Sequence, residues 1–229
     1  MESGTTEVEL LTFRSGEKAV RKVALHDTAS MREDASTSVR RTTRTADERA
    51  DAERVGFVVA RAIGARVPAA FRYSETEVLM DYFEGTGGRD FSVFDTAQRR
   101  FRDTPEAQRL RETPEGRRIG LLDVLIGNRD RNLDNWMVID GKVAGIDQGE
   151  AWSEAGKNLS DWRHKGFSRA YYDFENGRWR KNDLSHDDIE KLERALEALR
   201  PEFVPSRQDW YNDMMKRFAE IKRQSEWRG

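Results

Sequence analysis

The stretch at residues 121–152 constrains this chain more than any other part of it. Its sequence is LLDVLIGNRDRNLDNWMVIDGKVAGIDQGEAW, in which an apolar helix end gives way to a polar loop. Two short apolar runs follow, joined by Asp140-Gly141, a dipeptide that favours a tight hairpin turn. An acidic turn comes next. We therefore expect a helix, a polar loop and a two-stranded hairpin in this order.

Three polar residues of this stretch, Asp130, Asn135 and Asp147, suit one kind of chemistry. Phosphoryl transfer needs positioning and charge neutralisation rather than covalent chemistry from the enzyme. A loop of this kind can bring one carboxylate to a nucleophilic hydroxyl, and an amide oxygen and a second carboxylate to magnesium, which prefers hard oxygen ligands. Taken singly, each residue is an ordinary loop or turn former. Together, D-RNLD-N and IDQG fit the kinase order of catalytic Asp, Asn and metal-binding Asp.

Local signals before residue 85 predict strands and one helix. Thr45 and Glu48 form a capping-box pattern, and apolar residues then recur at helical spacing until Gly64 supplies a stop. Alternating apolar segments separated by polar turns predict strands. The predicted strands and helix cover residues 7–13, 18–25, 46–63, 67–73 and 77–83.

Signals after residue 85 are mainly helical. Thr-Pro pairs at 104–105 and 113–114 are typical of helix starts, and the second pair precedes an apolar helical period. Ser185 is placed to cap another helix that Pro201 ends, and residues 208–221 have a helical pattern. The fold class expected from these elements is α+β.

The segments GNRDRNLDNWMV and GKVAGIDQG resemble the catalytic and metal-binding loops of the phosphatidylinositol 3- and 4-kinase-like group, which includes many small bacterial proteins. In that group the first loop has the pattern D-R-H/N-x-x-N and the second I-D-x-G. The wider kinase-like superfamily also includes, more distantly, the HipA-type toxins. The resemblance implies a bilobal kinase-like fold. Residues 1–84 would form an N-lobe with an antiparallel sheet and one helix for ATP, and residues 85–229 a mainly helical C-lobe with the catalytic and metal-binding loops.

The resemblance also implies roles for the loop residues. Asp130 would be the catalytic base or hydroxyl-orienting group, and Asn135 and Asp147 would bind magnesium, with manganese as an alternative metal. Gln148 stands where eukaryotic protein kinases carry Phe, and Arg129 precedes the Asp without the usual His. These departures affect any regulation inferred from those enzymes and leave the chemistry unchanged.

In the N-lobe, the resemblance makes Lys22 the lysine that contacts ATP phosphates and Glu53 its ion-pair partner. Strand alternation puts Lys18 on the same face as Lys22, so spacing alone leaves both lysines open. Glu53 is preferred over Glu48 because Glu48 belongs to the helix cap.

Further nucleotide contacts are implied at two places. A short Ser-containing loop at the start of the chain would meet phosphate oxygens, with a flexible terminus as the alternative. The end of the strand predicted at 77–83 would bind adenine through its backbone, with core packing of the side chains as the alternative. These residues are Ser3, Gly4 and Thr5, and Met80, Asp81 and Phe83.

Composition excludes several other classes. The 40 basic and 42 acidic side chains nearly cancel, so no broad positive field favours nucleic acid or an anionic membrane. Arg40, Arg41 and Arg44 lie in a Ser/Thr-rich polar segment that we interpret as a solvated loop. No cysteine is present, the N-terminus lacks the pattern of a signal peptide, and no apolar run is long enough to span a membrane. We therefore expect a cytoplasmic protein without nucleic-acid or membrane partners.

The acceptor is the least constrained part of the function. Basic residues after the metal motif are scattered among acids, which disfavours an inositol phospholipid. Aromatic residues between 152 and 174 indicate either a peptide groove or core. We expect the hydroxyl of a protein or peptide Ser/Thr as acceptor. The alternatives are a small-molecule kinase such as an antibiotic phosphotransferase, which would need an acidic pocket, an adenylyltransferase, or a nucleotide-binding pseudokinase.

Overall fold

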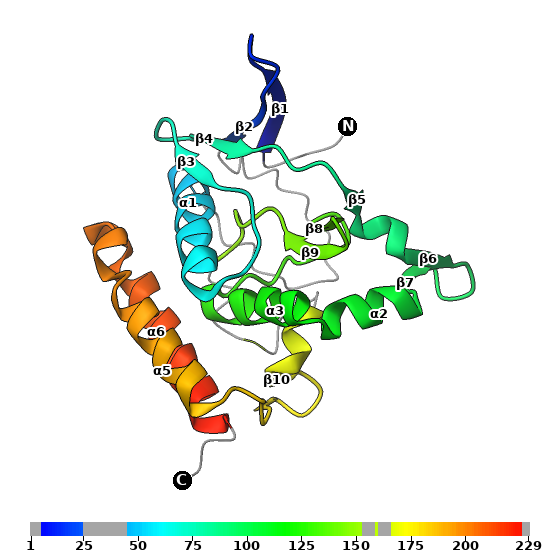
Figure 1. The fold of residues 1–229 in the computed structure, drawn as a ribbon, viewed down its shortest axis with the longest axis vertical. Helices are drawn as coiled ribbons and strands as arrows, with labels where there is room; N and C mark the ends of the chain where they lie inside the picture. The colour runs from blue at the N-terminus through cyan, green and yellow to red at the C-terminus, as the bar shows by residue number, and fades with distance from the viewer. Residues whose placement is uncertain (1–5, 25–44, 153–158, 160–165, 226–229) are drawn as a thin grey trace, which may run out of the picture.

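The computed structural model describes residues 6–24, 45–152, 159 and 166–225 (Figure 1). The predicted loop at 26–44, with Arg40, Arg41 and Arg44, lies outside them. In the first part of the chain the elements are β1 (Thr6–Thr12), β2 (Lys18–Ala24), α1 (Ala46–Ile63), β3 (Ala70–Arg72) and β4 (Glu77–Asp81). The elements that follow are β5 (Thr86–Gly87), η1 (Gly88–Phe91), β6 (Ser92–Asp95), β7 (Arg100–Asp103), α2 (Pro105–Glu112), α3 (Pro114–Ile126), β8 (Trp136–Ile139), β9 (Lys142–Gly145), η3 (Phe167–Ala170), β10 (Tyr172–Asp173), β11 (Arg178–Trp179), α5 (His186–Glu197), η4 (Arg200–Glu202), η5 (Pro205–Arg207) and α6 (Gln208–Gln224).

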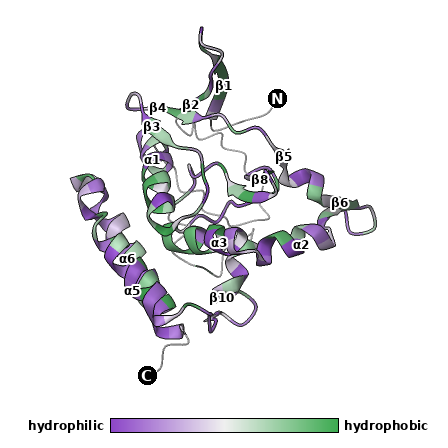
Figure 2. Ribbon diagram, in the orientation of Figure 1, coloured by the Kyte–Doolittle hydropathy of each residue, from purple (hydrophilic) through white to green (hydrophobic). Residues whose placement is uncertain are grey.

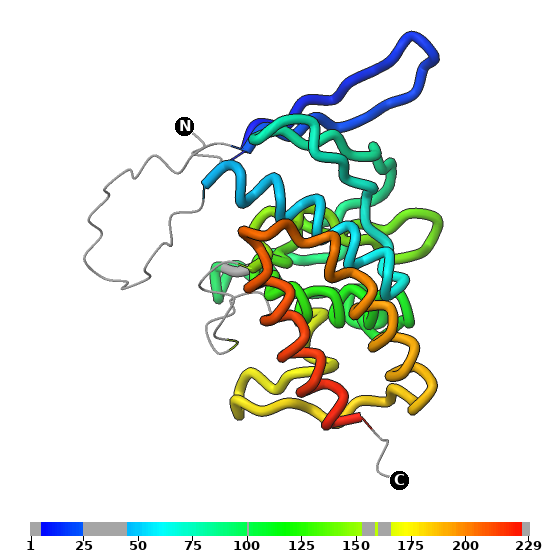
Figure 3. Tube along the Cα trace, turned by 90° about the vertical axis from the view of Figure 1, so that its left-hand side faces the viewer, coloured from blue at the N-terminus to red at the C-terminus, as the bar shows by residue number. Residues whose placement is uncertain are grey.

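The first four strands form one antiparallel sheet in the order β1-β2-β4-β3. The β1–β2 hairpin turns at Gly16, whose φ of 86° suits glycine, and it projects from the body of the molecule (Figure 3). Strands β3 and β4 lie inside the two predicted segments and are shorter than predicted. In the two central strands, Lys22 of β2 lies opposite Val78 of β4. This register sets the position of Lys22 along the sheet.

Helix α1 has the predicted bounds because its end signals are local. Thr45 and Glu48 make the reciprocal bonds of a capping box, and Gly64 ends the helix in the left-handed conformation. One side of α1 packs on β2, β3 and β4, where Ala50 joins a small apolar cluster, and the other packs on α3 and α5. The helix thus joins the sheet to the rest of the chain.

Helix α3 lies at the centre of the remaining part. Ile119, Leu122, Leu125 and Ile126 have no exposed surface, and the apolar residues of α5 and α6 complete the same core. Figure 3 shows α5 and α6 side by side, and in Figure 2 hydrophilic and hydrophobic residues alternate along them, as expected for helices with one buried face. The predicted α+β arrangement, a sheet with one helix followed by a mainly helical part, is confirmed.

Two features of the second part were not predicted. After the glycine-rich GTGG, β5 pairs with β8 and forms a three-stranded sheet with the hairpin, and β6 and β7 form a further antiparallel pair. A side chain at Gly88 would collide with the Trp136 indole, so the glycines let the chain pass close to the hairpin.

Helix α5 ends at Glu197, before Pro201, which lies in the short η4 turn.

The described aromatic residues between 152 and 174 form core rather than a groove. Buried members of this set are Trp152, Phe167, Tyr171, Tyr172 and Phe174, while Trp162 lies outside the described residues. Trp152 stacks on Trp210 with 5.1 Å between ring centroids. The groove considered as a peptide site is therefore not formed by these side chains. None of the helices in the described ranges combines the length and apolarity that crossing a bilayer requires.

Candidate active site

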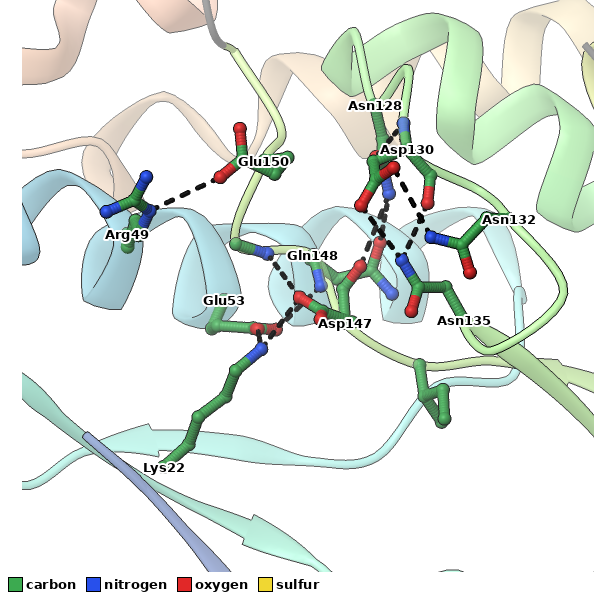
Figure 4. A network of polar contacts seen from close by, with 12 residues as sticks. Lys22, Arg49, Glu53, Asn128, Asp130, Asn132, Asn135, Asp147, Gln148 and Glu150 are labelled. Carbon is green, nitrogen blue, oxygen red and sulfur yellow. Dashed lines mark hydrogen bonds and ion pairs between the residues drawn. The ribbon is translucent and has the colours of Figure 1, made fainter. Parts of the chain in front are cut away.

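Lys22 extends from β2 toward α1 and the loop at residues 146–149 (Figure 4). Its ammonium contacts the carboxylate of Glu53 and lies 2.7 Å from Oδ1 of Asp147. Only 8% of Lys22 is exposed. Lys18 is exposed, with its ammonium 5.2 Å from the centre of the Tyr82 ring. The structure thus brings Lys22, and not Lys18, to Glu53.

Glu53 connects the lysine to the backbone of the 146–149 loop. Its second carboxylate oxygen accepts a 2.8 Å hydrogen bond from the backbone N–H of Gln148. One turn further along α1, a Cβ at Gly56 would lie 2.8 Å from Cβ of Gln148, so the absence of a side chain at Gly56 allows this close approach. Glu48 remains in the helix cap as predicted.

Burial and neighbouring charges set the protonation states of Glu53, Lys22 and Asp147. Burial raises the pKa of Glu53, and the neighbouring Asp147 carboxylate raises it further, against the ammonium of Lys22. Burial lowers the pKa of Lys22, but Glu53 and Asp147 together hold it above its ordinary value. Burial also opposes ionisation of Asp147, yet Lys22 lowers the pKa of this carboxyl to about 2. At neutral pH the site therefore presents a charged lysine and an ionised Asp147.

The loop between α3 and β8 holds Asp130 by hydrogen bonds (Figure 4). The side-chain amide of Asn135 donates to the carbonyl oxygen of Asp130 at 2.6 Å and to its Oδ2 at 3.2 Å. Asn132 donates to Oδ1 of Asp130 at 3.3 Å, and the Asp130 N–H donates to Asn128 at 3.0 Å. The carboxylate is therefore oriented by its own loop.

The β8–β9 hairpin brings Asn135 opposite Ile146, the residue before Asp147. Residues 135 and 146 face one another just beyond the open end of the hairpin, where the N–H of Ile146 donates to the carbonyl of Asn135 at 3.0 Å. Asp147 follows with φ of 60°, a left-handed conformation that costs a non-glycine residue about 1 kcal/mol or more and is often found at functional sites.

This donor set fits magnesium. Asn135 uses its NH₂ group on Asp130, so Oδ1 is the atom with which it could bind a metal, and Asp147 is ionised. An amide oxygen and a carboxylate are hard ligands, and magnesium commonly takes its remaining ligands from phosphates and water.

Arg131 is the main residue to which sequence reasoning gave no role. Its buried guanidinium pairs with Asp123 of α3 at 2.9 Å, donates to the carbonyls of Asn135 and Ile146, and donates to Oε1 of Gln148 at 2.7 Å. One side chain thus ties α3, the Asp130–Asn135 loop and the 146–149 loop together. The motif D-R contained it, but nothing local indicated its partners.

A second pair missed by sequence reasoning lies nearby. Arg49 of α1 donates to Glu150, just after the 146–149 loop, at 3.3 Å. Only 5% of Arg49 is exposed. The pair adds a second connection between α1 and this loop.

The structure describes only some of the other residues predicted to contact the nucleotide. The side chain of Met80 packs in the core beneath the sheet, and Asp81 exchanges two hydrogen bonds with the Ala69 backbone, so its N–H is used within the fold. Phe83 lies under the guanidinium of Arg66, 5.8 Å from it. Adenine binding by this segment stays a prediction and cannot use the Asp81 N–H as it stands. Residues Ser3, Gly4 and Thr5 lie outside the described residues.

Comparison with known proteins gives likenesses of structure only. No protein-family model and no curated protein matches the chain. The Rio2 kinase from Chaetomium thermophilum, solved as an ADP/Mg²⁺-phosphoaspartate complex, is 16% identical with a TM-score of 0.49, over 97% of this chain and 70% of that one. The Helicobacter pylori proinflammatory kinase CtkA is 11% identical with a TM-score of 0.48, over 97% and 90%. HipA of Shewanella oneidensis, in complex with HipB and operator DNA, is 9% identical with a TM-score of 0.43, over 96% and 64%. At these identities and TM-scores, the likenesses assign neither a family nor an activity to this chain.

Proposed function

We propose that this chain is an ATP- and magnesium-dependent phosphotransferase that phosphorylates the hydroxyl of a protein or peptide Ser/Thr. One observation carries the proposal: Lys22 bridges Glu53 and Asp147 beside the oriented Asp130–Asn135 loop. Such a set provides a cation for phosphates, oxygen ligands for a metal, and a carboxylate for the attacking hydroxyl.

Each residue has a distinct task in this proposal. Lys22, kept charged by its two carboxylates, would hold ATP phosphates, and Glu53 would position it. Asn135 and Asp147 would hold magnesium, which supplies neutralisation of phosphate charge. Asp130 would orient the acceptor hydroxyl and accept its proton.

The proposal extends to the organisation of the chain. We place the lobe boundary between residues 84 and 85, with ATP binding assigned to residues 1–84 and catalysis to residues 85–229. A cytoplasmic location and the absence of nucleic-acid or membrane partners are predictions from the sequence.

The role of Asp147 can be tested against a matched control. Asp147→Asn should weaken magnesium binding to the ATP-loaded protein about 10- to 100-fold or more, because it removes a charged ligand. Asp140→Asn is the control, since Asp140 also has a positive φ and its side chain is 88% exposed in the hairpin turn. Titration calorimetry, in which magnesium is added to the ATP-loaded protein, measures the magnesium affinity of both variants. Equal magnesium dependence in the two variants would contradict the assignment.

A further inference from the structure

A cavity of about 560 Å³ adjoins the catalytic loop. It lies among the loop, β7, α2 and the segment that enters η3. The described lining residues are Arg89, Phe101, Asp103, Arg111, Arg131, Asn132, Leu133, Asp134, Gly166 and Arg169. Its size is within the range that holds a small molecule or a few residues of a peptide.

One side chain links this cavity to the catalytic carboxylate. Asn132 lines the cavity and donates its amide to Oδ1 of Asp130 at 3.3 Å. A group bound there is therefore separated from the Asp130 carboxylate by one residue of the same loop. This places the cavity where an acceptor would approach.

The described lining is richer in arginine than in carboxylate, with four arginines and two aspartates. Arg131 is neutralised by Asp123, which is outside the lining. Arg111 makes a two-pronged ion pair with Asp103 and lies over the Phe167 ring, 5.3 Å from its centre.

Two arginines are accessible to an incoming anion. The side chain of Arg169 is 60% exposed, and its ion pair with Glu175 is loose, at 3.8 Å. Arg89 makes a two-pronged ion pair with Asp134, but both side chains are 58% exposed, so its guanidinium stays open to solvent and to an incoming anion. Arginine binds carboxylates and phosphates through paired hydrogen bonds, which makes both side chains suitable for such a group.

From this lining we infer that the cavity binds the acceptor, and that the acceptor is a peptide with a carboxylate or phosphate group near its reacting Ser or Thr. The inference rests on the proposed phosphotransferase function. In the reaction, the acceptor oxygen bonds to the γ-phosphorus of ATP, the bond from that phosphorus to the β–γ bridging oxygen breaks, ADP leaves with the bond electrons, and Asp130 takes the hydroxyl proton. A cationic acceptor, such as an aminoglycoside-like drug, would find both carboxylates of the described lining, Asp103 and Asp134, already paired with arginines.

The test uses the full chain, magnesium and γ-labelled ATP with four serine peptides that differ only in the flanking residues. The flanks are glutamate, phosphoserine, alanine and lysine. We expect the two anionic peptides to be phosphorylated with kcat/KM about tenfold or more above the alanine peptide, since a charge-assisted hydrogen bond contributes at least that factor. The ratio between the glutamate and phosphoserine peptides distinguishes a carboxylate from a phosphate as the preferred group.

Charge reversal at Arg169 separates recognition from folding. Arg169→Glu should raise KM for the glutamate peptide and lower it for the lysine peptide, a gain that an unfolded variant cannot show. Arg194→Glu, also an exposed arginine but on α5, should leave the order of the peptides unchanged. Phosphorylation of all four peptides at one rate, or an Arg169→Glu preference identical to that of the wild type, would overturn the inference while leaving the phosphotransferase intact. Absence of ATP turnover with or without peptide would overturn both.

Discussion

Replacing Arg131 with alanine is expected to lower the free energy of unfolding by about 3 to 5 kcal/mol, the usual cost of breaking a buried ion pair from one side. Asp123 would be left as a carboxylate with no exposed surface, and the carbonyls of Asn135 and Ile146 would lose a donor. Burial already raises the pKa of Asp123, and only Arg131 opposes this shift. Urea unfolding followed by tryptophan fluorescence measures the effect.

Two further variants identify the cause of that loss. Asp123→Leu combined with Arg131→Met should be more stable than Arg131→Ala, because no unpaired charge is buried. Arg129→Ala, in the same loop, should change stability by about 1 kcal/mol or less. If Arg131→Ala were as stable as Arg129→Ala, Arg131 would not tie the two loops to α3.

Asp130→Asn is expected to lower kcat for phosphoryl transfer by about 10²- to 10⁴-fold, the range found for loss of a general acid or base. The amide cannot accept the hydroxyl proton, whereas its shape still allows part of the hydrogen bonding with Asn132 and Asn135. Because Asp130 is not assigned to ATP binding, KM for ATP should change little. Steady-state assays with the best serine peptide measure both constants.

The control for this variant is Asp140→Asn, in the exposed turn of the adjoining hairpin. It makes the same chemical change and should retain wild-type kcat. A wild-type kcat in Asp130→Asn would show that Asp130 only shapes the loop. A loss of folded protein large enough to account for the fall in kcat, measured by thermal unfolding, would point to the same conclusion.

Parts of the fold that depend on neighbouring residues were predictable. The bounds of α1 follow from Thr45, Glu48 and Gly64, and the β8–β9 turn follows from Asp140-Gly141, because caps and tight turns are satisfied within a few residues. The short pair β6–β7 was missed. Its strands have few residues and exposed apolar side chains, such as Val93 and Phe94, so they carry no clear alternation of buried and exposed positions.

Within the site, too, relations between nearby residues were predictable and contacts between distant segments were not. The order of Asp130, Asn135 and Asp147 indicated a common site because the hairpin between them is local. Strand spacing left Lys18 and Lys22 open, since the partner that distinguishes them, Glu53, comes from a different element. Arg131 could not be assigned for a similar reason: its partners include Asp123 of α3 and residues that follow β9. Contacts between distant segments are set by packing, which the pattern of one segment does not contain.

The central claim, that this chain transfers the γ-phosphoryl group of ATP to a hydroxyl, is tested most directly with ATP labelled at either the γ or the α position. The purified protein and Asp147→Ala are incubated with each label, magnesium and the serine peptides, and acid-stable label on peptide and protein is counted. We predict transfer of γ label to serine, lost in the variant, and no transfer of α label. Transfer of α label would make the chain an adenylyltransferase, and ATP binding without transfer of either label would make it a nucleotide-binding pseudokinase.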